Sequence, residues 1–176
     1  MEQGQQSIIL RKGGISEGKH GFQWLHPKFF LFPSYFHEQE KQLNLKQPLE
    51  SPETPTKDRD DVEIRLFAKT VRTIEISELK TAEQLAPFHV WKPSVVEERF
   101  GWGESQGLSL AIVRVCRLET PWVLKNRTGF GGCRSWLGLP REEGLPDNWH
   151  ETLQPVLSDE EFGRTETELA GLGFSG

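Results

Sequence analysis

The chain has 176 residues, of which 35% are hydrophobic and 27% charged, and its formal net charge is −5. This length suits one domain with a modest core. The negative charge argues against a surface that is basic throughout, but it allows a local basic patch. No stretch approaches the roughly 20 apolar residues of a membrane-spanning helix, and the opening MEQGQQS lacks the features of a signal peptide. We therefore expect a cytoplasmic protein that does not enter the membrane.

The two cysteines, Cys116 and Cys133, do not form a C-x-x-C pair, and the histidines do not have the spacing of zinc ligands. In a cytosolic chain such cysteines are usually free thiols. We predict two free thiols, no structural metal and no cofactor.

The N-terminal stretch from Gln6 to His37 combines short apolar runs with glycine- and proline-containing turns. Apolar runs bounded by turn residues predict short β-strands. We expect strands at Gln6–Arg11, Phe22–Leu25 and Phe29–Phe32, a turn at Gly13 and Gly14, and a helical turn from Pro33 to Glu38.

The segment from Lys41 to Asp61 is polar and contains three prolines. Because it can bury little apolar surface, we expect a mobile loop there. This loop interrupts a single domain that spans residues 1–162. The last residues, 163–176, are predicted to form a flexible C-terminal tail.

The middle of the chain alternates apolar and charged residues from Val62 to Ile76, which is the period of a β-strand. After it, serines precede two short amphipathic stretches, a pattern typical of capped helices. We expect a helix at Glu78–Leu85 capped by Ser77, a strand at Phe88–Trp91, and a helix at Val95–Phe100 capped by Ser94.

The run Leu108–Leu118, which reads LSLAIVRVCRL, predicts a central strand. A turn at Gly129–Gly132 and a strand at Ser135–Leu139 follow it. Strands are short and outnumber helices. This predicts an α+β fold, with a small mixed, strongly bent β-sheet or partial barrel and a few short helices. The first and central strands are loosely similar to small PUA-like RNA-binding barrels.

Several segments resemble one family. Two long segments, 6–15 (QSIILRKGGI) and 29–37 (FFLFPSYFH), are accompanied by the shorter motifs Glu98-Arg99-Phe100, Arg114-Val115-Cys116-Arg117-Leu118, Gly132-Cys133-Arg134-Ser135-Trp136 and Pro155-Val156-Leu157-Ser158-Asp159. Together they resemble a bacterial family called domain of unknown function 1802, over nearly the whole chain to Phe162. The resemblance implies no catalytic residue and no activity.

The candidate ligand-binding residues pair cations with aromatics or glycines. They are Arg11, Lys12, Gly13, Gly14, Tyr35, His37, Arg99, Trp102, Arg114 and Arg134. Flexible glycine amides beside Arg11 and Lys12 suit a phosphate or carboxylate, whereas the structural alternative is a hairpin turn with exposed cations. Tyr35 and His37 belong to an aromatic run that forms either a stacking platform or, more commonly, core.

Arg99 and Trp102 lie in a glycine-containing loop motif that suits stacking and phosphate contact, with a packed tryptophan as the alternative. Arg114 lies in an apolar strand, where an unpaired charge is costly. We expect it to reach a ligand, water, or a carboxylate such as Glu98 or Glu63. Arg134 lies beside Cys133, for which a buried structural thiol is favoured over a nucleophile.

These patterns lead to three functional hypotheses. The leading one is a non-enzymatic domain that binds RNA, DNA or a phosphorylated ligand, because Arg and Lys recur beside aromatics in an acidic chain. The second is a metal-dependent nuclease or other hydrolase, with His37 as general base or metal ligand and Glu38 or Glu63 assisting. The third is an assembly factor with a protein partner, suggested by six tryptophans.

Overall fold

Two long antiparallel strands, β3 (Asp61–Ile76) and β4 (Leu108–Lys125), form the centre of the sheet. The structure is a computed structural model that describes residues 1–12, 22–33, 39–44, 61–103, 106–130, 135–139 and 144–174. The other strands are β1 (Ile8–Arg11), β2 (Lys28–Leu31) and β5 (Gln154–Pro155). The helices are α1 (Gln39–Gln42), α2 (Leu79–Glu83), α3 (Pro93–Gly101) and α4 (Asp159–Gly171), with short 3-10 turns at Ala86–Phe88 (η2) and Thr128–Phe130 (η3).

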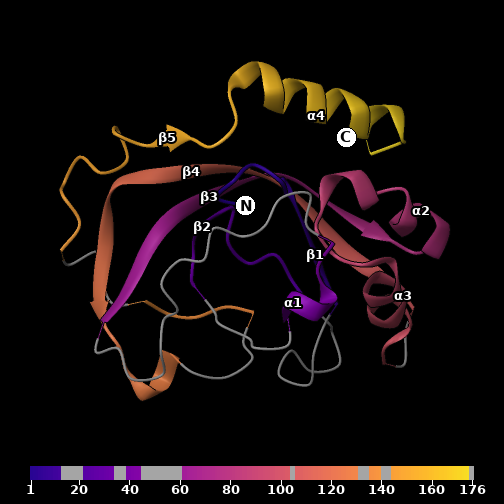
Figure 1. Cartoon of the computed structure of the whole chain (residues 1–176), viewed down its shortest axis with the longest axis horizontal. Coiled ribbons are helices and arrows are strands. Elements are labelled where there is room, and N and C mark those ends of the chain that lie inside the picture. Colours follow the sequence, from indigo (N-terminus) through magenta and orange to yellow (C-terminus); the bar gives the residue numbers. More distant parts are fainter. Residues whose placement is uncertain are drawn as a thin grey trace.

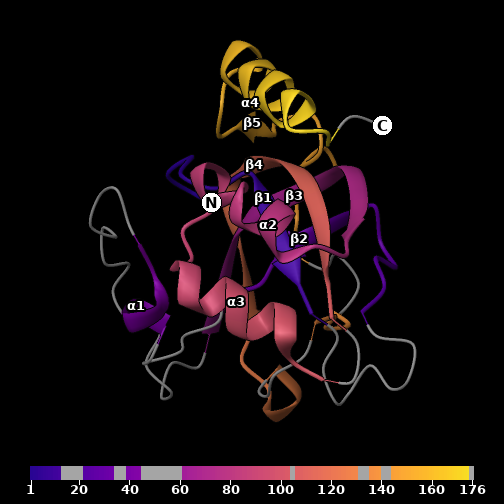
Figure 2. The ribbon, with the colours of Figure 1, turned by 90° about the vertical axis from the view of Figure 1, so that its right-hand side faces the viewer.

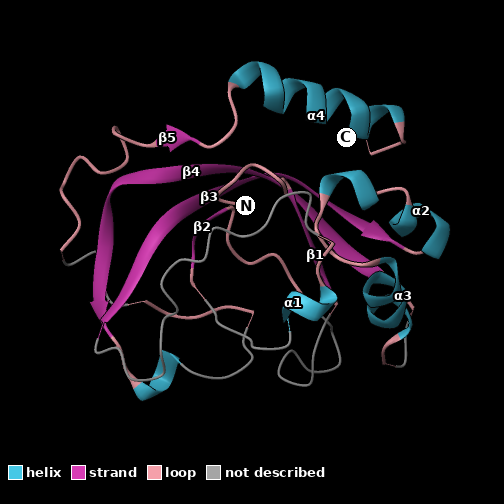
Figure 3. Cartoon of the chain, in the orientation of Figure 1, coloured by secondary structure: helices cyan, strands magenta, loops and turns pink. Residues whose placement is uncertain are grey.

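The sheet has the order β1-β4-β3-β2, and β5 also pairs with β4. Every pairing between the described strands is antiparallel, and the sheet is open (Figures 1 and 3). The predicted α+β fold with a bent sheet and a few short helices is therefore confirmed. The sheet is antiparallel where a mixed one was expected, and it does not close into a barrel.

Irregular pairing between β3 and β4 accompanies the strong bend of the sheet. Ile64 pairs with Trp122 while Leu66 pairs with Arg117, so residues 118–121 of β4 face a single residue of β3. Extra residues on one strand bend it and increase its twist, and Pro121 lacks an N–H for the ladder. The strand predicted from Leu108 to Leu118 continues beyond this irregularity and ends at Lys125. Figure 1 shows β3 and β4 curving together.

Three helices cover one face of the sheet, which we call the helix face. Figures 1 and 2 show α4 as a layer above the sheet, and Figure 1 shows α2 and α3 at the end of the sheet. The buried residues of this layer form one cluster, drawn from alternate positions of β1 and β4 and from the helices: Ile8, Leu10, Ile76, Ala82, Leu85, Phe88, Val96, Phe100, Leu108, Leu110, Ile112, Phe162, Leu169 and Phe174. Alternation along β4 thus supplies the main core from every second residue.

The opposite face of the sheet carries a second cluster, which contains Ala68, Ala111, Val113 and Val115 and is covered in part by Trp24 and Phe29. A third cluster lies at the far end of β3 and β4, around the fully buried Trp122. Because strand residues alternate between faces, the apolar run of β4 is buried on both sides. This explains why its sequence reads as almost continuously hydrophobic.

The C-terminal residues expected as a flexible tail are folded instead. Residues 163–171 form most of α4, and Leu169 and Phe174 are buried in the core of the helix face. The helix begins with a capping box, in which Ser158 accepts from the Glu161 N–H and Glu161 accepts from the Ser158 N–H. Arg72 donates to the carbonyl of Phe174 at the other end of the helix. The polar composition reflects the exposed side of an amphipathic helix.

Three short strand predictions are wrong. Residues 22–25 contain no strand, because the rings of Phe22 and Trp24 pack against Trp136. The stretch Phe88–Trp91 is split between the end of η2, where Pro87 starts the turn, and a single bridge from Leu43 to Trp91. Residues 135–139 are irregular.

The predicted serine caps of α2 and α3 are also wrong. Glu78 and Lys92 occupy the cap positions, and neither makes a side-chain cap hydrogen bond. Pro93 takes the first position of α3, which moves the cap to the residue before it. The predictions for residues 13–21, 34–38 and 45–60 lie outside the described residues.

Candidate anion-binding site

The end of β1 meets the C-terminal end of α3 through Lys12. Its Nζ donates to the carbonyl oxygens of Phe100, at 3.3 Å, and Gly107, at 2.9 Å. Burial lowers the pKa of Lys12 below its ordinary value. Carbonyls at the end of a helix carry partial negative charge, so a lysine there is stabilising. Lys12 therefore fixes β1 to α3 and places Arg11 beside this junction.

Two arginines with stacked guanidinium groups lie at this junction. The Arg99 guanidinium carbon lies 4.0 Å from the ring centroid of Trp91, and that of Arg11 lies 5.5 Å from that of Phe22. Burial lowers the pKa of Arg99, repulsion from Arg11 lowers it further, and Glu98 acts in the opposite direction. The two positive groups are thus close enough to repel each other. We call Arg11, Lys12 and Arg99 the cationic corner.

An exposed aromatic residue follows the helix that carries Arg99. Trp102 directly follows α3, and its side chain is 62% exposed. Its backbone N–H donates to the carbonyl of Arg99 at 3.4 Å, a main-chain contact at the end of α3. An exposed tryptophan of this kind offers a flat surface for stacking, while Trp91 is occupied by the Arg99 guanidinium.

A buried histidine contacts the backbone of Trp91. His89 is only 6% exposed, and its Nδ1 accepts a hydrogen bond from the Trp91 N–H at 3.1 Å. Its Nε2 is buried without a hydrogen-bond partner, and burial lowers its pKa from 6.5 to about 4. The ring is therefore neutral at pH 7, as an acceptor at Nδ1 must be. Sequence reasoning missed His89, because no local pattern separates it from the other histidines.

An aromatic cluster adjoins the corner on the side of Arg11. The ring of Trp136 contacts those of Phe22, Trp24, His26 and Phe29 at centroid distances of 5.0 to 6.2 Å. Edge and offset contacts of this kind add to the packing energy. The cluster therefore fixes Phe22, the ring under Arg11.

A polar chain fixes the cluster to the sheet. The Trp24 Nε1–H donates to Ser109 Oγ at 2.7 Å, and that hydroxyl donates to Glu75 Oε1 at 2.6 Å. Arg11, Ser109 and Glu75 are direct partners across β1, β4 and β3. They therefore share one face of the sheet, so the carboxylate of Glu75 lies on the same face as Arg11.

The structure brings together three of the predicted ligand-binding residues from separate parts of the sequence, namely Arg11, Lys12 and Arg99, and a fourth, Trp102, follows Arg99 at the end of α3. Five others, Gly13, Gly14, Tyr35, His37 and Arg134, lie outside the described residues. The last, Arg114, lies elsewhere.

Residues 1–168 match the family described as Domain of unknown function (DUF1802). The chain belongs to this family. The resemblance seen in the sequence is therefore confirmed, and it extends beyond Phe162 into α4. No curated protein and no solved structure matches the DUF1802 chain.

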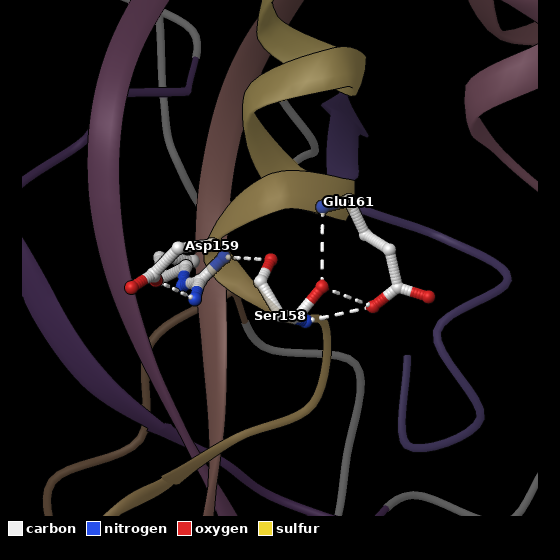
Figure 4. A network of polar contacts seen from close by, with 4 residues as sticks. Ser158, Asp159 and Glu161 are labelled. Atoms are coloured by element: carbon white, nitrogen blue, oxygen red, sulfur yellow. Dashed lines mark hydrogen bonds and ion pairs between the residues drawn. The ribbon is translucent and has the colours of Figure 1, made fainter.

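Arg114 of this DUF1802 chain is held by the start of α4. Its guanidinium donates to the carbonyl oxygen of Ser158, at 3.1 Å, and to Asp159, at 2.6 Å. Both acceptor residues are labelled in Figure 4. The same group lies 4.8 Å from the ring centroid of Phe162. Glu98 and Glu63, its expected partners, do not pair with it, since Glu63 instead binds Arg65. The sequence could not place α4 against β4.

Cys116 is a free, buried thiol, as predicted, whereas Cys133 lies outside the described residues. Burial raises the pKa of Cys116, while Lys69 and Arg114 act in the opposite direction. A raised pKa keeps the sulfur protonated and unreactive at pH 7. Within the part of the DUF1802 chain that the structure describes, no three His, Cys, Asp or Glu side chains are grouped as metal ligands, and no helix is long and apolar enough to cross a membrane.

Proposed function

We propose that this protein is a non-enzymatic domain that binds single-stranded nucleic acid at the cationic corner. The observation that carries the proposal is the pair Arg11 and Arg99, which repel each other while each lies over an aromatic ring. Two guanidinium groups at one junction suit a phosphate, which accepts charge-assisted hydrogen bonds from both.

The residue types of the corner suit a nucleotide rather than a simple anion. Arginine can bind a phosphate through two parallel N–H donors, and its planar group stacks on aromatic rings. Trp102, which follows α3 three residues after Arg99 and is 62% exposed, supplies a stacking surface for a base. A base can reach such a ring only when it is unstacked, which favours a single strand over a duplex.

The charge of the whole chain supports a small local site. With a net charge of −5, most of the surface repels a polyanion, so binding depends on a few contacts and on the salt concentration. A cytoplasmic location, predicted from the sequence, is part of this proposal because it gives access to RNA. A phosphorylated small molecule is an outcome that the binding test distinguishes.

The test is fluorescence anisotropy of a labelled 20-nucleotide single-stranded RNA at low salt. Arg99→Ala should weaken binding about 10-fold or more, because a hydrogen bond to a charged group contributes about 1.5–3 kcal/mol. Trp102→Ala should weaken it to a similar degree, since stacking contributes about 1–3 kcal/mol per base. Arg164→Ala, which removes an exposed arginine of α4, is the matched control and should bind as the wild type does.

The outcomes separate the alternatives. Equal affinity of the wild type and Arg99→Ala would overturn the proposal. Displacement of the RNA by inorganic phosphate or a mononucleotide at similar concentration would replace the single strand with a small phosphorylated ligand.

The nuclease and assembly hypotheses gain no support from the described residues. Of the residues assigned to a nuclease, only Glu63 is described, and it forms an exposed ion pair with Arg65. We therefore propose neither function.

A further inference from the structure

The helix face carries a line of three cations on neighbouring strands, which we call the cationic row. Lys28 of β2 pairs directly with Lys69 of β3, and Lys69 pairs directly with Arg114 of β4. Direct partners in an antiparallel sheet point to the same side. We propose that the cationic row binds the phosphate backbone of a nucleic-acid duplex, independently of the cationic corner.

The row brings like charges close together. Neighbouring strands lie about 4.8 Å apart, and like charges directly opposite each other destabilise a sheet. Both Lys69 and Arg114 favour the negative form of the Cys116 thiol, which confirms that their charges lie near one point of this face. Among the described residues, neither Lys28 nor Lys69 has an ion-pair partner, and both side chains are exposed.

One end of the row is rigid. The side chain of Arg114 is 14% exposed and is held by Ser158, Asp159 and Phe162, as Figure 4 shows for the polar contacts. From this point α4 runs toward the end of the molecule that carries α2 and α3 (Figure 1). The charge of Arg114 is paired with Asp159, whose side chain is fully exposed, so the positive charge that the row offers to a ligand is that of Lys28 and Lys69, both of which are exposed.

The surroundings of the row favour a nucleic-acid backbone over an acidic peptide. The next cross-strand pair on this face is Phe30 with Phe67, and both rings already pack against Trp149 at 5.0 to 5.2 Å. A bound peptide usually places apolar side chains in pockets. Here the rings of Phe30, Phe67 and Trp149 already pack against one another. Lysines bind phosphates as point charges, so they can contact the backbone of a duplex while its bases stay stacked. A duplex backbone therefore fits.

The experiment measures binding of a labelled 20-base-pair DNA duplex at several salt concentrations. Each phosphate contact contributes about 0.9 to the slope of log affinity against log salt, so Lys28→Ala combined with Lys69→Ala should reduce the slope by about 1.8. The matched control combines Lys80→Ala with Arg127→Ala, two exposed cations outside the row, and should leave the slope unchanged. The expected loss of affinity at low salt is about 10-fold.

A second variant tests the row without any nucleic acid. Lys69→Glu places a carboxylate directly opposite Lys28 and should raise the melting temperature by about 1–3 °C, since it turns the repulsion between these two side chains into attraction. A lower melting temperature would show that the two lysines do not repel each other, and would remove the basis of the proposal.

Three further results would overturn the proposal. The lysine double variant could keep the affinity and slope of the wild type. Arg99→Ala could abolish duplex binding while the lysine variant does not, which would assign the duplex to the corner. Poly-glutamate could bind the wild type in a lysine-dependent manner while the duplex does not bind, which would assign the row to an acidic protein. None of these results depends on single-stranded RNA, so failure of the row and failure of the corner can be told apart.

Discussion

Arg99 and Arg114 both lie over aromatic rings, but their surroundings differ. Arg114 has a carboxylate at 2.6 Å and a carbonyl at 3.1 Å, both supplied by the start of α4. Arg99 has the ring of Trp91 at 4.0 Å and a second arginine close enough to lower its pKa. The first arrangement holds the fold together, whereas in the second two cations lie close to each other and Glu98 acts against their repulsion. The same residue type beside a ring therefore serves structure in one region and favours a ligand in the other.

The comparison depends first on α4 being part of the core. Leu169→Ala should destabilise the protein by about 2–5 kcal/mol, because it empties a fully buried position. Leu172→Ala, at a 39% exposed position just beyond the helix, is the control and should have a much smaller effect. Chemical denaturation measures both. Equal, small effects would mean that residues 163–176 behave as the tail that their composition predicts.

Acid should affect the corner through His89. The pKa of His89 is about 4 in the folded protein and 6.5 when unfolded. The unfolded chain therefore takes up the proton first, and stability falls as the pH drops from 6.5 to 4, by up to about 3 kcal/mol. Above pH 6.5 both states are neutral, and this group contributes no pH dependence.

Unfolding measured between pH 4 and pH 7 checks this expectation. His89→Gln removes the titrating group and should flatten the pH dependence over this window, while Arg164→Ala should leave it unchanged. An equally steep profile in His89→Gln would assign the acid sensitivity to other groups.

The structural role of Arg114 can be separated from the role proposed for Arg99. Arg114→Ala should reduce stability by about 1–2 kcal/mol, because it removes one charge-assisted hydrogen bond to Asp159 and one to Ser158. Arg99→Ala should reduce stability by less, about 0.5–1 kcal/mol from its ring contact. The reverse order in thermal unfolding would contradict the assignment of the two regions.

A further small effect concerns the cap that holds α4 beside Arg114. Ser158→Ala should cost about 1 kcal/mol, because the Glu161 N–H loses its acceptor. The hydrogen bonds from Ser158 also lower the pKa of Glu161, so titration of this carboxyl should move toward its ordinary value in the variant. Ser158→Asp retains a capping side chain and serves as the control. Loss of stability in both variants alike would contradict the capping role.

Much of the sheet could be predicted from the sequence. Alternation of apolar and polar residues marked the strand from Val62 to Ile76, and the apolar run after Leu108 marked the central strand, because side chains on a strand alternate between faces. The α+β class and the family followed from such local patterns. The errors occurred where proline or aromatic packing changed the local structure, as at Pro87, Pro93 and the ring contacts of Trp136.

The candidate site was only partly predictable. Residue types pointed to Arg11, Lys12, Arg99 and Trp102 one at a time, but nothing local showed that β1 and α3 meet. The contact depends on hydrogen bonds from Lys12 to carbonyls 88 and 95 residues away in the chain. His89 was missed for the same reason, since its burial results from packing between segments that are far apart in sequence.

By itself, the sequence determined the strand periods, the apolar face of each long strand and the family, because these depend on residues within a few positions of one another. Only the tertiary structure decided which charges are neighbours. A shift of the β3–β4 register by one residue would move Lys69 to the other face and separate it from Arg114. The cationic row and the cationic corner both depend on such long-range pairing, which is why neither could be read along the chain.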